Sequence, residues 1–361
     1  MIVIKSKILS AVLSIVFLAN AVLFLASPAP IESYELIYEL PINGATGFVL
    51  ARQYLTESPN ENSARLRPIY PGHPFTIISS QENYLKIEYG RITGWINNSL
   101  ALVNLPDIIP SIIYFNTNAT RSLFQSSGYG LPNIHEEQLY IARGFNSRFT
   151  EEQYIMPILY RTAILLYNAQ QAALANGNSL KIYETFRPLD IQTSINISLR
   201  ELIRQNQTVN EGINTNGWRT NWFIAGGVST HQLGAGVDLA LVRVRDYRIR
   251  ATGGFEYKII TSYTEYTMPS KMHELSAEAV VTERPTGWSA QNGFGGVNFA
   301  RTMSVGALRL HNYMVDAGFT PLASEWWHFD DWQAWNHLRR HHPTVNGNFR
   351  LQGLASRQPT P

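Results

Sequence analysis

The sequence contains no cysteine in its 361 residues, which excludes disulfides, cysteine nucleophiles and cysteine-ligated zinc sites. Any metal ion must therefore be held by His, Asp or Glu. The chain also lacks a strong excess of either charge. Its net charge is +2 and it has no long basic run, so nucleic acid is not an expected partner. The length suffices for one large domain or two smaller ones with hydrophobic cores.

The N-terminal 30 residues carry a long apolar run. Lys5 and Lys7 precede it, and it extends from Ile8 to Ala26, close to the roughly 20 residues that cross a bilayer. Since both lysines come first, the positive-inside rule places the rest of the chain outside the cytoplasm, in the periplasm or cell envelope. Residues 1–30 are predicted to be a signal peptide or a membrane anchor. The anchor is slightly favoured because the run exceeds the ~7–15 apolar residues usual for a signal peptide.

Residues 40–104 are rich in short β patterns. The runs "GFVLARQYL", "HPFTIIS" and "YLKIEYG" are separated by Pro, Gly and Asn. The stretch "YLKIEYGRITGWI" resembles the last strands of bacterial SH3-like domains. This resemblance implies a small all-β barrel that either binds a cell-wall polymer or acts only as a structural cap. The two prolines of "NLPDIIPS", residues 104–111, predict a linker after it.

Residues 105–345 are predicted to form one mixed unit of helices and strands. Thr150 and Gln153 match a capping box, and the apolar stripe that follows predicts a helix over 150–176 that ends before Gly177. The run "LKIYETF" after that glycine predicts a strand.

A second helix is expected over 302–317, ended by Gly318, with three inward-facing residues: Val305, Leu308 and Met314. Strands that enter and leave packed helices indicate an α+β fold. The segments 253–258 and 287–296 are expected to be flexible loops along a substrate groove, and residues 346–361 a disordered tail.

The run "STHQLGAGVDLAL", Ser229 to Leu241, places His231 and Asp238 seven residues apart with glycines between them. The segment around Asp238 reads as a buried strand, and an unpaired buried carboxylate is very costly. Asp238 therefore needs a partner. That partner is either an arginine or strand-edge backbone, or a metal ion shared with His231.

The run "SEWWHFD", Ser324 to Asp330, adds Glu325 and His328. A mononuclear catalytic zinc commonly has three protein ligands and an open position for water. His231, Asp238 and His328 together could supply two imidazoles and a carboxylate. Glu325 would then be free to act as the base on the metal-bound water. On spacing alone, purely structural histidines remain the alternative.

The pattern "SxHxxGxxxD" followed by "EWWHF" is similar to the D-alanyl-D-alanine dipeptidase and carboxypeptidase family of zinc peptidases, nearest its VanX-type branch. Four further segments resemble that family in the same order: "IIYFNTNATRSLFQSSGYGLP", "LKIYETFRP", "TMPSKMHELS" and "RLHNYMVDAGFTPLASEWWHFD". The resemblance covers residues 106–335. It implies the zinc peptidase fold, shared with hedgehog-type signalling domains, for residues 105–345.

The resemblance also implies roles for individual residues. His231, Asp238 and His328 would hold Zn²⁺, and Glu325 would pass a proton from the metal-bound water to the leaving amine. Arg187 would donate hydrogen bonds to the oxyanion; its structural alternative is an ion pair with Glu184.

Four residues are candidates for substrate binding: Ser229, Glu184, His273 and Glu274. The dipeptidases carry an aspartate at the position of His273, where it binds the ammonium group of the dipeptide. If Glu274 does not replace that aspartate, selection for a free amine is lost.

The expected function is zinc-dependent hydrolysis of D-alanyl-D-alanine-type bonds in peptidoglycan stem peptides or their fragments. Two alternatives stay open: a strict dipeptidase acting on free D-Ala-D-Ala, and a non-catalytic zinc-containing module that binds the cell wall. The second is open because a fold does not guarantee a function.

Overall fold

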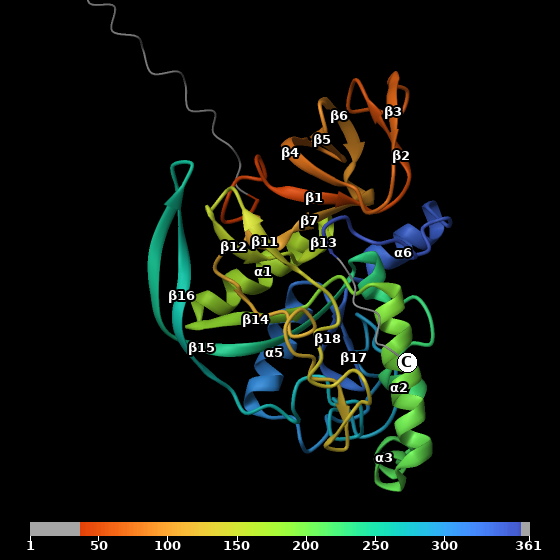
Figure 1. Ribbon diagram of the computed structural model, residues 1–361. Helices are drawn as coiled ribbons and strands as arrows, with labels where there is room; N and C mark the ends of the chain where they lie inside the picture. The colour runs from red at the N-terminus through yellow and green to blue at the C-terminus, as the bar shows by residue number, and fades with distance from the viewer. Residues whose placement is uncertain (1–36, 355–361) are drawn as a thin grey trace, which may run out of the picture. The chain divides into compact units, whose positions relative to one another are not determined.

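The computed structural model describes residues 37–354, which belong to one compact unit. The predicted signal peptide or anchor, residues 1–30, lies outside the described residues. Within the described part, no helix combines the length and apolar character needed to span a bilayer. The architecture is α+β, as the sequence predicted, and its sheets are mainly antiparallel (Figure 1).

The first sheet has eight strands in the order β13-β7-β1-β4-β5-β6-β2-β3. Its strands are β1 (Thr46–Val49), β2 (Gln53–Thr56), β3 (Arg65–Ile69), β4 (Pro74–Gln81), β5 (Tyr84–Tyr89), β6 (Ile92–Asn97), β7 (Ala101–Asn104) and β13 (Pro157–Leu159). The β content predicted for residues 40–104 is confirmed, but the sheet is open: no pairing joins β13 to β3 in the described chain. The expected closed barrel is therefore not seen. One physical reason is that β13, from outside the predicted domain, pairs with β7.

The segment 104–111 is not a linker, contrary to the sequence prediction. All eight of its residues are buried, and Leu105–Asp107 form a short 3-10 helix. Ile108 and Ile109 are fully buried in the main hydrophobic core. The prolines therefore shape a buried turn, and the sheet before this turn shares its core with the elements after it.

The second sheet carries the candidate site. Its order is β17-β18-β15-β14-β8, and β16 pairs with the outer part of β15. The bounds are β8 (Ile113–Tyr114), β14 (Asn178–Glu184), β15 (Gly236–Thr252), β16 (Phe255–Glu265), β17 (Thr320–Leu322) and β18 (Glu325–Asp330). The strand predicted from "LKIYETF" is confirmed as β14.

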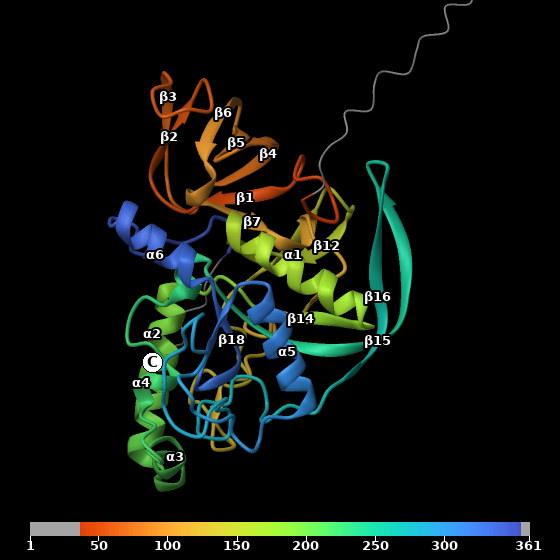
Figure 2. The same ribbon diagram turned by 180° about the vertical axis from the view of Figure 1, so that it is seen from behind.

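Helices α1 (Tyr160–Ala175) and α5 (Val305–Asp316) contact each other and the same face of this sheet (Figure 2). The other helices are α2 (Leu189–Gln205), α3 (Gln207–Ile213), α4 (Thr220–Phe223), α6 (Trp332–His341) and the 3-10 turns η1 (Asn98–Leu100), η2 (Leu105–Asp107) and η3 (Thr230–Leu233). Two small hairpins complete the described fold: β9 (Gln125–Ser126) with β10 (Tyr129–Gly130), and β11 (Arg143–Asn146) with β12 (Glu151–Tyr154).

The helix predicted over 150–176 is wrong in its first ten residues. Thr150 has a φ of 55°, outside the right-handed helical region, and residues 151–154 form β12, paired with β11. The capping-box pattern was overridden because strand partners are available on both sides of Met156. The second predicted helix is confirmed as α5, with Ser304 as its N-cap. Of its expected inward residues, Met314 is buried, Leu308 is half-buried and Val305 is 65% exposed.

Two segments expected to be flexible are ordered. Residues 253–258 form the tight turn and first residues of the β15–β16 ribbon, where a continuous antiparallel ladder replaces the expected loop. Residues 346–354 pack against the rest of the chain although disorder was predicted for 346–361. Leu351 and Leu354 are buried, and the backbone amide of Gln352 donates to the carbonyl of Gly72. Residues 355–361 lie outside the described chain.

Replacement of Asp107 by Ala tests the buried turn. Its carboxylate accepts hydrogen bonds from the Thr46 amide and hydroxyl and from the side chains of Asn104 and Asn146. Because the variant leaves several buried donors unsatisfied, we expect the free energy of unfolding to fall by about 2–4 kcal/mol. Urea unfolding measures this, with Glu256→Ala on the exposed ribbon as control. Equal losses in both variants would contradict the buried-turn assignment.

Candidate metal centre

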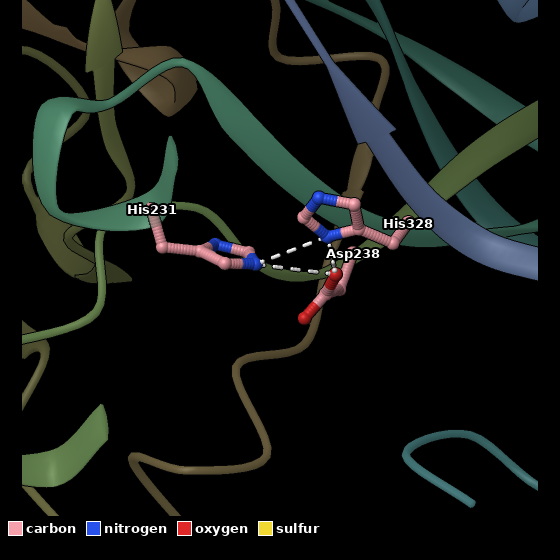
Figure 3. Close-up of side chains that lie close together, drawn as sticks. All are labelled: His231, Asp238 and His328. Carbon is pink, nitrogen blue, oxygen red and sulfur yellow. Dashed lines mark hydrogen bonds and ion pairs between the residues drawn. The ribbon is translucent and has the colours of Figure 1, made fainter. Parts of the chain in front are cut away.

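The three predicted metal ligands come from three elements and meet at one point. His231 lies in η3, Asp238 in β15 and His328 in β18, and Asp238 is directly paired with His328 in the antiparallel register. His328 Nδ1 is 2.9 Å from Asp238 Oδ1, and His231 Nε2 is 3.2 Å from His328 Nδ1 and 3.4 Å from Asp238 Oδ1 (Figure 3). All three side chains are buried and close enough together to bind one metal ion.

These separations fit a metal ion. Zinc–ligand bonds of roughly 2.0–2.2 Å in tetrahedral geometry place neighbouring ligand atoms about 3.3–3.6 Å apart. The observed 2.9–3.4 Å reaches the lower end of that range, so a bound ion would need only a small outward shift of the ligands. The donor set of two imidazoles and one carboxylate is also one that a cysteine-free chain can offer.

The opposite nitrogen of each imidazole is anchored by a further hydrogen bond. His231 Nδ1 lies 2.6 Å from the carbonyl oxygen of Thr185, and His328 Nε2 lies 2.8 Å from Asp330 Oδ1. Such outer partners fix ring orientation in metal sites. They leave His231 Nε2 and His328 Nδ1 directed at the shared point.

Two glycines allow the tight return between His231 and Asp238. A Cβ on Gly236 would lie 2.5 Å from Thr230 Oγ1 and 3.2 Å from the His231 amide nitrogen. Gly234 has a φ of 65°, which favours glycine. The glycines of the sequence motif therefore allow close approach of the backbone between His231 and Asp238.

The electrostatics of the centre favour a cation. Burial alone would raise the pKa of Asp238, but the three histidines around it, with His231 the strongest, hold that pKa well below its ordinary value. Burial alone would lower the pKa of His328, but Asp330 and Asp238 raise it well above its ordinary value. Both shifts indicate that the carboxylates favour positive charge on or near the histidines.

Glu325, the predicted base, begins β18 and lines the same cavity of about 220 Å³ as the three ligands. Its carboxylate has no hydrogen-bond partner among the described residues. Burial raises its pKa to about 8, and nearby Asp238 contributes in the same direction. A partly desolvated carboxyl group with a pKa near neutrality is suited to accept and return a proton.

Arg187 follows β14 and also lines this cavity. Its Nη2 is 2.5 Å from Glu184 Oε2 and 3.0 Å from Asp238 Oδ2, and its Nη1 donates to Gln192 Oε1 at 2.7 Å. The ion pair with Glu184, foreseen as the structural alternative, is therefore present. The same guanidinium group also lines the cavity.

Of the four predicted substrate-binding residues, Ser229 alone lines the cavity, whereas Glu184 and His273 lie close to Asp238 behind it. Ser229 lines the cavity, and its hydroxyl donates to Gln232 Oε1. Glu184 is fully buried and does not line the cavity; it accepts from Asn118, Tyr140 and Arg187.

His273 and Glu274 also lie outside the cavity lining. Glu274 accepts hydrogen bonds from the amides of Ser127 and Gly128 and from the Ser276 hydroxyl. Its carboxylate is therefore engaged in hydrogen bonds within the protein. His273 is fully buried against Asp238.

Sequence reasoning missed Asp330, Gln192 and the Thr185 carbonyl. Asp330 had a usable signal, since it lies two residues after His328 on the same strand and therefore on the same face. Gln192 had none, because its contact with Arg187 depends on the position of α2.

Comparison with models of known protein families gives no match, and no curated protein matches the chain either. The site is thus characterised by its geometry and chemistry.

The pKa of Glu325 predicts a pH-dependent stability of the metal-free protein. Folding raises this pKa from 4.5 to about 8, so between these values the native state binds more protons than the unfolded chain. Stability contributed by the protonated form is then lost as pH rises through this range. We expect the melting temperature of Glu325→Gln to rise relative to that of the wild type as the pH increases from 4.5 to 8. Calorimetry in the presence of a chelator measures this difference. Parallel profiles would show that Glu325 is not desolvated.

Proposed function

We propose that the protein is a zinc peptidase that hydrolyses D-alanyl-D-alanine-type bonds in peptidoglycan stem peptides or their fragments. One observation carries the proposal: Glu325 is buried, its carboxylate forms no hydrogen bond with residues 37–354, and it lines the same cavity as three atoms close enough together to bind a metal ion. Zinc fits because it accepts all-nitrogen-and-oxygen tetrahedral sites with an open position. The motif order along the chain supports the substrate class.

The geometry supports a separate role for each group in the proposed reaction. When bound, zinc would lower the pKa of water and polarise the scissile carbonyl. Glu325 accepts a proton in the cavity and returns it to the leaving amine. Arg187 presents a guanidinium that is always charged and is held rigidly by Glu184 and Gln192. Trp327 and Trp222 supply apolar cavity walls, which strengthen these electrostatic interactions.

The cavity favours peptides without a free ammonium group near the cleaved bond. Its lining contains three carboxylates: Asp238, Glu325 and Asp330. Asp238 already contacts Arg187 and the histidines, and Asp330 contacts His328. Because Glu325 is needed as the base, no lining carboxylate remains to bind an amine. This supports cleavage of longer stem peptides over strict dipeptidase activity.

An extracytoplasmic location suits this substrate, because peptidoglycan stems lie outside the cytoplasmic membrane. It agrees with the orientation expected from the apolar N-terminal segment. We also propose that the first sheet binds a cell-wall polymer. A purely wall-binding role for the whole protein accounts less well for an unpartnered buried base beside the ligand cluster.

Glu325→Gln separates catalysis from metal binding. The amide keeps the shape of the side chain but cannot accept the proton, so we expect kcat to fall about 10²–10⁴-fold. Zinc content should remain at about one ion per chain. Purified protein is assayed by mass spectrometry of digested muropeptides and by elemental analysis.

His231→Ala serves as the complementary variant and should lose both zinc and activity. Equal hydrolysis by wild type and Glu325→Gln would rule out the proposed reaction.

Substrate choice is tested with two compounds. Residues 37–361 are incubated with free D-Ala-D-Ala and with a muramyl pentapeptide that ends in D-Ala-D-Ala. We expect kcat/KM to be at least tenfold higher for the pentapeptide, because no cavity carboxylate is free to hold the ammonium group of the dipeptide. A preference for the dipeptide would instead support the strict dipeptidase alternative.

A further inference from the structure

His273 occupies the position where the resembling dipeptidases carry an ammonium-binding aspartate, yet its side chain does not face the cavity. We propose that His273 is a positioning residue that fixes Asp238 for one-oxygen coordination of the metal, and that it does not bind substrate. This rests on the metal site within the proposed function, but not on the reaction assigned to it.

The two carboxylate oxygens of Asp238 have different surroundings. Oδ1 faces the other two ligands, at 2.9 Å from His328 Nδ1 and 3.4 Å from His231 Nε2. Oδ2 lies 3.0 Å from Arg187 Nη2 and 3.2 Å from His273 Nε2. Two donors therefore engage Oδ2 and direct it away from the shared point. Only Oδ1 is left for a metal ion, which preserves an open coordination position.

His273 has a backbone conformation that is uncommon for a non-glycine residue. Its φ is 60°, in the left-handed region that non-glycine residues rarely adopt, and its side chain is fully buried. The imidazole stacks on Phe124 with ring centroids 4.2 Å apart and planes 7° apart, and meets Trp327 edge-on at 6.1 Å. Packing on two sides therefore fixes the ring with Nε2 toward Asp238.

Hydrogen-bond chemistry assigns the tautomer. An ionised carboxylate only accepts hydrogen bonds, so the ring nitrogen beside Asp238 Oδ2 must carry a hydrogen. The opposite nitrogen, His273 Nδ1, is buried and has no partner in the described chain. The expected form is thus the neutral Nε2–H tautomer. Because Nδ1 forms no hydrogen bond in this buried position, the polar contact that accounts for the placement of the ring is the one between Nε2 and Asp238.

A second metal ion is the main competing explanation, because Glu184, Asp238 and His273 also lie close enough together to bind one. Arg187 already supplies a cation there: its Nη2 is 2.5 Å from Glu184 Oε2 and 3.0 Å from Asp238 Oδ2. A divalent ion beside this buried guanidinium would be strongly repelled. The geometry therefore favours one metal ion, with His273 outside its coordination sphere.

Two matched variants test the assignment. His273→Phe keeps a flat apolar ring against Phe124 but removes the donor, whereas His273→Gln retains an N–H group that can reach Asp238. We expect the zinc affinity of His273→Phe, measured by chelator competition, to fall about 10–100-fold, as is typical when an outer partner of a ligand is lost. His273→Gln should stay closer to the wild type. In the Co²⁺-substituted proteins, His273→Phe should alter the visible absorption bands.

Wild-type zinc affinity and an unchanged Co²⁺ spectrum in folded His273→Phe would overturn the proposal. So would a raised KM for the peptide with metal affinity intact, or two zinc ions per wild-type chain. If His273→Phe does not fold, ¹⁵N NMR of the wild type decides the matter: the Nε2–H tautomer of His273 supports the role, and the Nδ1–H tautomer excludes it. The zinc-affinity, Co²⁺-absorption, metal-content and NMR measurements do not require hydrolysis, so failure of the proposed reaction would be distinguished from failure of this inference.

Discussion

The antiparallel pairing of β15 with β18 is the interaction on which the candidate site depends. It sets Asp238 opposite His328 in the ladder and brings Glu325, at the start of β18, to the same cavity. A shift of one residue in this register would turn these side chains to opposite faces of the sheet. The glycine-containing return before β15 then brings His231 to the pair, so the backbone ladder largely defines the ligand geometry.

Burial of the charged groups at this site carries an energetic cost. Charged and polar groups removed from water must be paired, and a half-satisfied network is costly. The structure meets this requirement by giving Asp238 and Glu184 several partners each, with Arg187 linking them, and by pairing Asp330 with His328. Glu325 is the exception, and its pKa of about 8 reflects that isolation. A bound divalent cation nearby would favour its ionised form.

The meeting of His231, Asp238, His328 and Glu325 at one cavity could be predicted from sequence because two local motifs and their resemblance to a known family point to these residues. The anchoring residues could not, since the contact of Gln192 with Arg187 and of His273 with Asp238 depends on elements far apart in the chain. The same reason explains the fold errors. Residues 150–159 carry a helix-start pattern, but pairing with β11 and β7 made them strands, and the prolines at 104–111 gave no sign of burial.

The central claim is that one metal ion lies between His231, Asp238 and His328. Anomalous diffraction from crystals grown with Zn²⁺, recorded on both sides of the zinc absorption edge, tests it most directly. We expect one strong peak roughly 2.0–2.2 Å from His231 Nε2, Asp238 Oδ1 and His328 Nδ1. No peak at this point in zinc-saturated crystals, or a peak only at other residues, would contradict it.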